Sequence, residues 1–237
     1  MKKVILLAGI CLLISHIAMS QVKPFRFGLK LAPNAAWVSP DSESYEKDGA
    51  APGFSWGFIS DFTITENYFV GTGFNVNYLN GKLQYPHKMD IIEDEDTTTY
   101  TGTLKRKYNF RYIELPLTLK MKTNKFNTTQ FYGQIGFSLG FKVKSKAQDD
   151  FSYKDEDGNY MSETSEGDIS HEVTLLKGAL VLGGGLEYYI DESTSILVGI
   201  TFSNGLSNVL KGTNTVDPSI EQKASLSYIE LSLGVIF

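Results

Sequence analysis

The strongest constraint in this sequence is a strict two-residue alternation of apolar with small or polar side chains. In the last segment, Leu231 and Phe237 belong to an apolar face, and Tyr228, Glu230 and Ser232 to the opposite one. Successive side chains of a β-strand point to opposite faces, so this alternation predicts strands. The pattern occurs in eight segments, at 25–31, 54–64, 68–78, 112–121, 131–144, 179–188, 195–203 and 228–237.

The length and the polar composition of these segments favour strands that cross a membrane. Most are longer than the ~5–6 residues of an ordinary strand, and a tilted membrane strand needs about 9–11. Small polar residues fit the narrow interior of an eight-stranded barrel, and the apolar face then meets lipid. A soluble lipocalin-like binder would need apolar residues inside, and this apolar face is too large for one small cavity. We predict an all-β, eight-stranded antiparallel transmembrane barrel.

The connections between these segments alternate in length. The long ones cover 33–52, 80–107, 146–171 and 204–223, and the short ones 65–67, 123–129 and 191–193. Outer-membrane barrels have short periplasmic turns and long extracellular loops, so we expect both termini on the periplasmic side. Aromatic residues near the strand ends, among them Tyr108 and Phe110, predict a girdle at the membrane surface.

The N-terminus resembles a secretory signal. Lys2 and Lys3 precede a short apolar run, and Ala18-Met19-Ser20 fits a cleavage site, so we expect a signal peptide over 1–20 and a mature barrel over 21–237. The run is too short for a membrane helix. A lipoprotein signal at Cys11 is the other alternative. The protein is therefore predicted to reach the bacterial outer membrane, with lipid around it.

A net charge of −5 without a basic cluster argues against nucleic acid as a partner.

Several charged residues are predicted to point into the barrel. A buried charge is costly unless it is paired, and this set of five bases and four acids nearly balances. It favours a plugged, salt-bridged interior over a wide conducting pore. The residues are Arg26, Lys30, Asp61, Glu114, Lys120, Lys142, Lys177, Glu187 and Glu230.

Two stretches resemble known patterns. The terminal Phe237 on an alternating strand resembles the C-terminal signal through which the barrel-assembly machinery handles outer-membrane barrels. The segment Tyr112–Lys120, YIELPLTLK, resembles the central motif of the PorT-like outer-membrane barrel family, and GLKLAPNAAW at 28–37 resembles its first strand. In that strand Ala32 and Pro33 stand where the family has Gly and its neighbour. The resemblance implies a barrel and does not imply a reaction, and the founding member of that family is linked to protein secretion. We expect Pro116 to sit at a bulge because proline breaks a strand ladder.

The sequence offers little support for catalysis or cofactors. His87 and His171 lie in separate predicted loops, and Cys11 is the only cysteine. The glycine run at 183–185 continues a strand instead of opening a phosphate-binding helix, and the acidic loops do not match a calcium-loop spacing. We therefore expect no enzyme, cofactor or metal, and a structural, interaction or narrow-transport role, with a protein partner of unspecified identity. A secretion-linked accessory barrel and an outer-membrane enzyme are the alternatives.

Overall fold

The computed structural model describes residues 24–93 and 96–237. The predicted signal peptide at 1–20, Cys11 included, lies outside the described residues, as does the expected mature N-terminus at Gln21. Among the described residues, no helix is both long and apolar enough to cross a membrane.

The described chain is almost entirely β-structure, with one short 3₁₀ helix, η1 (Ser170–Glu172). The strands are β1 (Phe25–Pro40), β2 (Glu46–Thr65), β3 (Tyr68–Glu93), β4 (Asp96–Lys122), β5 (Thr129–Lys154), β6 (Tyr160–Asp168), β7 (Leu176–Tyr189), β8 (Ser195–Gly205) and β9 (Ala224–Ile236).

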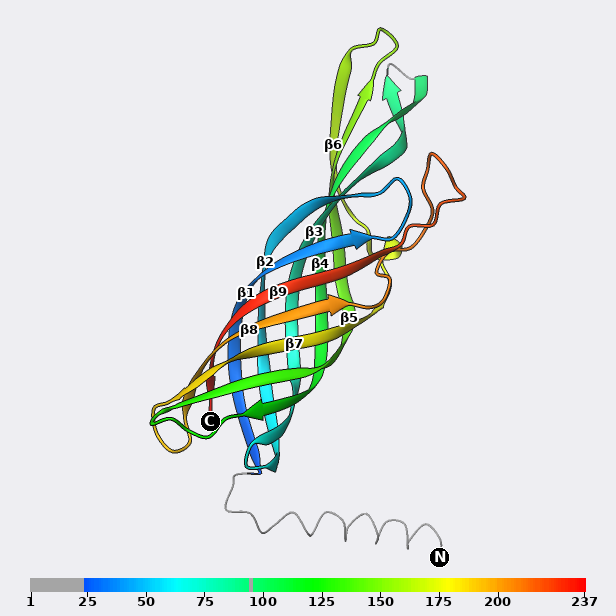
Figure 1. Cartoon of the computed structure of the whole chain (residues 1–237). Coiled ribbons are helices and arrows are strands. Elements are labelled where there is room, and N and C mark those ends of the chain that lie inside the picture. The colour runs from blue at the N-terminus through cyan, green and yellow to red at the C-terminus, as the bar shows by residue number, and fades with distance from the viewer. Residues whose placement is uncertain (1–23, 94–95) are drawn as a thin grey trace, which may run out of the picture.

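Eight of these strands close into a ring, which confirms the predicted antiparallel barrel. The order around the ring is β1, β2, β3, β4, β5, β7, β8 and β9, and β9 returns to β1 (Figure 1). The one strand outside the ring is β6, which pairs with the end of β5 farthest from the short turns. Closure leaves no open sheet edge in the lipid-facing part, as a bilayer requires.

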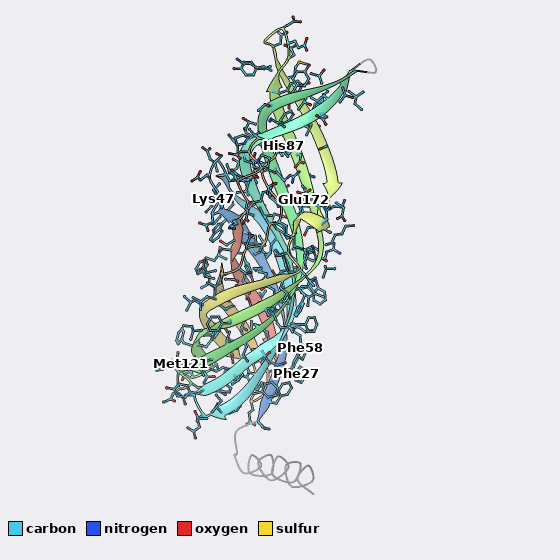
Figure 2. All side chains as sticks on the ribbon, turned by 90° about the vertical axis from the view of Figure 1, so that its right-hand side faces the viewer. Phe27, Lys47, Phe58, His87, Met121 and Glu172 are labelled. Atoms are coloured by element: carbon cyan, nitrogen blue, oxygen red, sulfur yellow. The ribbon has the colours of Figure 1, made fainter. Side chains whose placement is uncertain are left out.

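The lower part of the barrel carries its apolar side chains on the outside. Leu117 is 63% exposed while its neighbour Thr118 is 5% exposed, and Leu231 and Ser232 differ in the same way. Figure 2 shows Phe27, Phe58 and Met121 in this lower half, at the end with the short turns. On β4 the apolar band covers positions 113–121, about the 9–11 residues that a tilted membrane strand needs.

Three of the four long connections are largely strands, which corrects their prediction as loops, whereas 206–223 contains no strand. β3 and β4 continue as a hairpin through most of 80–107, β5 and β6 fill much of 146–171, and β1 and β2 extend into 33–52. The β3–β4 and β5–β6 hairpins project beyond the ring of strands (Figure 1). We call this region the cap, defined as residues 79–93, 96–110, 145–168 and 206–223.

The side-chain polarity of the strands inverts between the barrel and the cap. In the cap, the inward positions are mostly apolar and most charged residues point outward, apart from a partly buried pair formed by Arg106 and Asp149, so the main apolar core lies there. Tyr108 and Phe110 are 1% and 2% exposed, so their prediction as girdle residues was wrong. The inversion of polarity lies close to a register shift between Arg111 and Tyr112. At this shift a bulge changes which β5 side chains face inward.

Pro116 does not lie at a bulge. It keeps register with Ser138 on β5, and the β3–β4 register is the same on both sides of it. Because proline has no N–H, the ladder to β3 is interrupted rather than shifted. Opposite Pro116 in this register is Gly73, whose φ of +141° favours glycine, and the hydroxyl of the adjacent Thr72 donates to the Pro116 carbonyl at 2.8 Å.

Candidate functional site

The lumen near the short turns is filled by a chain of ion pairs. The Arg26 guanidinium lies 2.7 Å from the Glu187 carboxylate, and the Lys122 ammonium lies 2.7 Å from its other oxygen. The Asp61 carboxylate lies 2.8 Å from the Lys120 ammonium and 3.5 Å from the Lys122 ammonium. All five residues are less than 9% exposed. Three cations and two anions from four strands therefore bind the barrel wall together across its interior.

Two further ion pairs lie in the same lumen. Lys30 pairs with Glu230 across β1 and β9. Lys177 lies 2.5 Å from one oxygen of Glu114, and the Tyr228 hydroxyl donates to the other oxygen at 2.9 Å. The Glu114 carboxylate thus has a partner on each oxygen, which is the condition for keeping a charge in a dry interior.

The structure places eight of the nine predicted lumen residues in these ion pairs. Lys142 is the exception: among the described residues it has no acidic partner, and its ammonium donates to the carbonyls of Ser170 and Val173. Lys142 still stands opposite Tyr112 on the inward parity, and the register shift of β5 lies just beyond it, toward the cap. Sequence reasoning missed Lys122, although it shares the inward parity of Glu114 and Lys120 on β4.

The glycines of the lumen make room for Tyr132. A Cβ on Gly199 would lie 2.0 Å from the Tyr132 hydroxyl, and one on Gly185 would lie 3.0 Å from the ring. The ring in turn lies near the Lys120 ammonium, 5.1 Å from its centroid. The glycine run at 183–185 therefore accommodates a buried aromatic side chain.

The remaining space in the lumen is small. A cavity of about 70 Å³ lies between the ion pairs, lined among others by Lys30, Asp61, Glu114 and Tyr132. One water needs about 10–15 Å³ on this scale, so the cavity has room for a few waters.

The cap closes the other end of the lumen with an apolar core. Tyr108 and Phe110 stack with ring centroids 5.4 Å apart, and Phe151 is fully buried. Leu210, from the connection between β8 and β9, packs in the same core. Burial of each large apolar side chain contributes about 1.5–3 kcal/mol, so the cap is a stable folded unit rather than a set of free loops.

Arg106 ties the cap together from inside. Its guanidinium binds both oxygens of Asp149, at 2.6 and 2.7 Å, and Glu172 of η1 at 2.6 Å. Burial lowers the pKa of the neighbouring His87, and the Arg106 charge lowers it further. Figure 2 shows His87 and Glu172 in this upper half. The His87 ring nitrogen bonds the hydroxyl of Thr215, at 2.9 Å, which anchors the β8–β9 connection.

Phe237 lies at the seam where the barrel closes. Its N–H donates to the Phe27 carbonyl at 2.7 Å, and the two rings lie 5.5 Å apart. Within the described ranges, no group of three or more His, Cys, Asp or Glu side chains is arranged to hold a metal ion.

A comparison with protein-family models identifies the family to which this barrel belongs. The family model described as "Outer membrane protein beta-barrel domain" matches residues 18–236. The chain belongs to this family. The protein is therefore a bacterial outer-membrane barrel, and the cap is the part of this barrel that extends beyond the membrane.

Several solved outer-membrane barrels are similar to this one. Neisserial surface protein A is 15% identical, with a TM-score of 0.43 over 90% of this chain and 96% of that one. OprG from Pseudomonas aeruginosa is 12% identical, with a TM-score of 0.43 over 91% and 97%. Ail, the attachment invasion locus protein of Yersinia pestis, is 12% identical, with a TM-score of 0.39 over 91% and 100%. A search of the curated proteins found no match.

Proposed function

We propose that this outer-membrane barrel is closed to ions and solutes and acts as a binding protein through its cap. The observation that carries the proposal is that the lumen is filled at two levels. Ion pairs centred on Glu187 occupy the short-turn end, and the aromatic core around Tyr108 occupies the cap end. The cavity of about 70 Å³ between them is too small for a solute path.

The charge of the cap indicates what kind of partner it binds. Residues 149–168, which form most of the β5–β6 hairpin, include eight acidic residues and one lysine. All nine residues of β6 are exposed. Complementary charge steers association and selects partners, so we propose a protein with a basic surface as the partner.

Neutralising the hairpin tip tests this function. The triple variant Asp155→Asn/Glu156→Gln/Asp157→Asn should lose most of a partner that co-purifies with the wild-type protein after cross-linking and mild detergent extraction. The matched control, Glu66→Gln/Glu192→Gln, removes charge at the short-turn end and should retain the partner. Equal capture by all three proteins, or loss in both variants, would rule out the acidic tip as the binding surface.

A secretion-linked accessory role is the second candidate. It rests on the resemblance of 112–120 to the PorT-like motif, whereas the family match covers the barrel domain in general. In this structure, Glu114 of the motif pairs with Lys177 and Pro116 interrupts a strand ladder. Both features serve the barrel itself. A secretion component among the cross-linked partners would support this role over a general binding role.

The same proposal includes an orientation. The beginning of β1 and the C-terminus both lie at the short-turn end (Figure 1), which in outer-membrane barrels faces the periplasm. This fits export through a cleaved signal peptide and insertion by the barrel-assembly machinery, with Phe237 as its signal. An epitope inserted at Gly158, a turn residue with φ +83°, should be labelled on intact cells. An epitope at Ser193 should be labelled only after permeabilisation, and the reverse pattern would contradict the orientation.

A further inference from the structure

The outer face of the barrel carries a cluster of cations where its apolar band ends toward the cap. Tyr78, Arg111 and Lys144 lie side by side on β3, β4 and β5, because Tyr78 is in register with Arg111 and Arg111 with Lys144. The next row toward the cap consists of Asn80, Asn109 and Lys146, again in register.

These side chains line a hollow without a carboxylate. It has a volume of about 340 Å³, and its lining consists of Tyr78, Asn80, Asn109, Phe110, Arg111, Lys144 and Lys146. A second hollow, farther along the cap, has Asp48, Asp149, Asp150 and Glu166 in its lining together with its basic residues. Of these two hollows, only the one at the edge of the apolar band has no acidic residue among its charged lining residues.

The cations of this hollow are poorly neutralised by the protein. Lys146 pairs with Glu166 at 3.0 Å. Among the described residues, neither Arg111 nor Lys144 has an acidic group within ion-pair distance. The charge of Lys144 acts on Asp168, but the Asp168 carboxylate accepts the Ser170 N–H at 2.8 Å and forms no ion pair with Lys144. Like charges directly opposite on neighbouring strands destabilise a sheet, so an anion bound between Arg111 and Lys144 would relieve their repulsion.

The position of the pair identifies the anion. Immediately below it, Ile113, Phe141 and Val143 are exposed apolar residues of the lipid-facing band. Arg111 also lies 4.7 Å from the Tyr78 ring centroid, and tyrosine is typical of the headgroup layer. An anion at this level, with apolar chains below it, matches the phosphate of a membrane lipid.

We propose that Arg111 and Lys144 form a binding site for the phosphate of a lipid headgroup. The planar guanidinium of Arg111 offers two parallel donors to phosphate oxygens, and the Lys144 ammonium adds a point charge. The acyl chains of the same lipid lie along the apolar face beneath them. The register shift at Arg111 and Tyr112 sets which β5 residue stands opposite Arg111, and so brings the two cations together.

Retention of lipid by the refolded full barrel tests this site. The protein is folded into phosphatidylcholine vesicles with or without diphosphoryl lipid A, extracted into mild detergent, and examined by native mass spectrometry. The wild-type barrel should keep lipid A in preference to phosphatidylcholine, because the choline of phosphatidylcholine balances its phosphate charge whereas the two phosphates of lipid A are uncompensated. The double variant Arg111→Gln/Lys144→Gln should lose about tenfold or more of this preference, because it removes charge-assisted hydrogen bonds.

Control measurements separate the site from general electrostatics. Lys154→Gln removes an exposed charge from the far end of β5 and should bind lipid A like the wild type. Because Arg111 and Lys144 are both exposed, the double variant should still fold, which its heat-modifiable gel mobility verifies. Equal lipid retention by the wild type and the double variant would overturn the proposal. Equal retention of dephosphorylated lipid A, or displacement of lipid A by equimolar inorganic phosphate, would also overturn it, since each would show that the site does not select a lipid phosphate.

Discussion

Glu187→Gln should destabilise the barrel by about 3–5 kcal/mol, the cost of breaking a buried ion pair by removing one partner. Glu187 is fully buried and neutralises both Arg26 and Lys122. Without its charge, the short-turn end of the lumen would hold three cations against Asp61 alone. The free energy of unfolding in urea, measured for the barrel in lipid vesicles, checks this expectation.

Glu192→Gln is the matched control for this substitution. Glu192 is an exposed acidic residue in the nearby β7–β8 turn, and its neutralisation should change stability by less than about 0.5 kcal/mol. The double variant Glu187→Gln/Lys122→Met should recover part of the loss, because it removes one of the unpaired cations. If Glu187→Gln were as stable as Glu192→Gln, the lumen ion pairs would not hold the barrel together.

Leu117→Arg should cost about 2–4 kcal/mol, the penalty for a charge at the centre of the lipid-facing surface of a barrel. Leu117 is 63% exposed on the outer face, in the middle of the apolar band of β4. The same urea titration in vesicles measures the change. Leu117→Phe, which keeps an apolar side chain at the same position, should stay close to the wild type. A similar small change for both variants would mean that Leu117 does not face lipid.

Alternation alone was enough to predict the barrel and most of its lumen residues. Glu114, Lys120 and Glu187 stand at inward positions of regular strands, so their side chains had to share one interior. Their partners could not be predicted, because pairing depends on register between distant strands. Arg26 and Glu187 meet although 161 positions separate them, and Lys122 lay just beyond the segment whose alternation we had followed.

The cap was missed because its polarity pattern is the reverse of the barrel's. Leu104, Tyr108 and Phe110 continue the inward parity of β4, yet these positions turn from polar to apolar beyond the membrane. In a sequence, that inversion looks like the end of a strand. Lys142 keeps the predicted inward parity, opposite Tyr112, but its ammonium binds backbone carbonyls of Ser170 and Val173 instead of an acid, which alternation could not indicate.

Single-channel recording in a planar bilayer tests the central claim, a closed lumen, most directly. Refolded wild-type barrel, with folding verified by its heat-modifiable gel mobility, should give no steady current above the leak of the bilayer. The ion pairs around Glu187 and the aromatic core around Tyr108 leave no continuous path between them. Steady, stepwise current through the wild-type protein would contradict this account and return the barrel to the class of narrow transport channels.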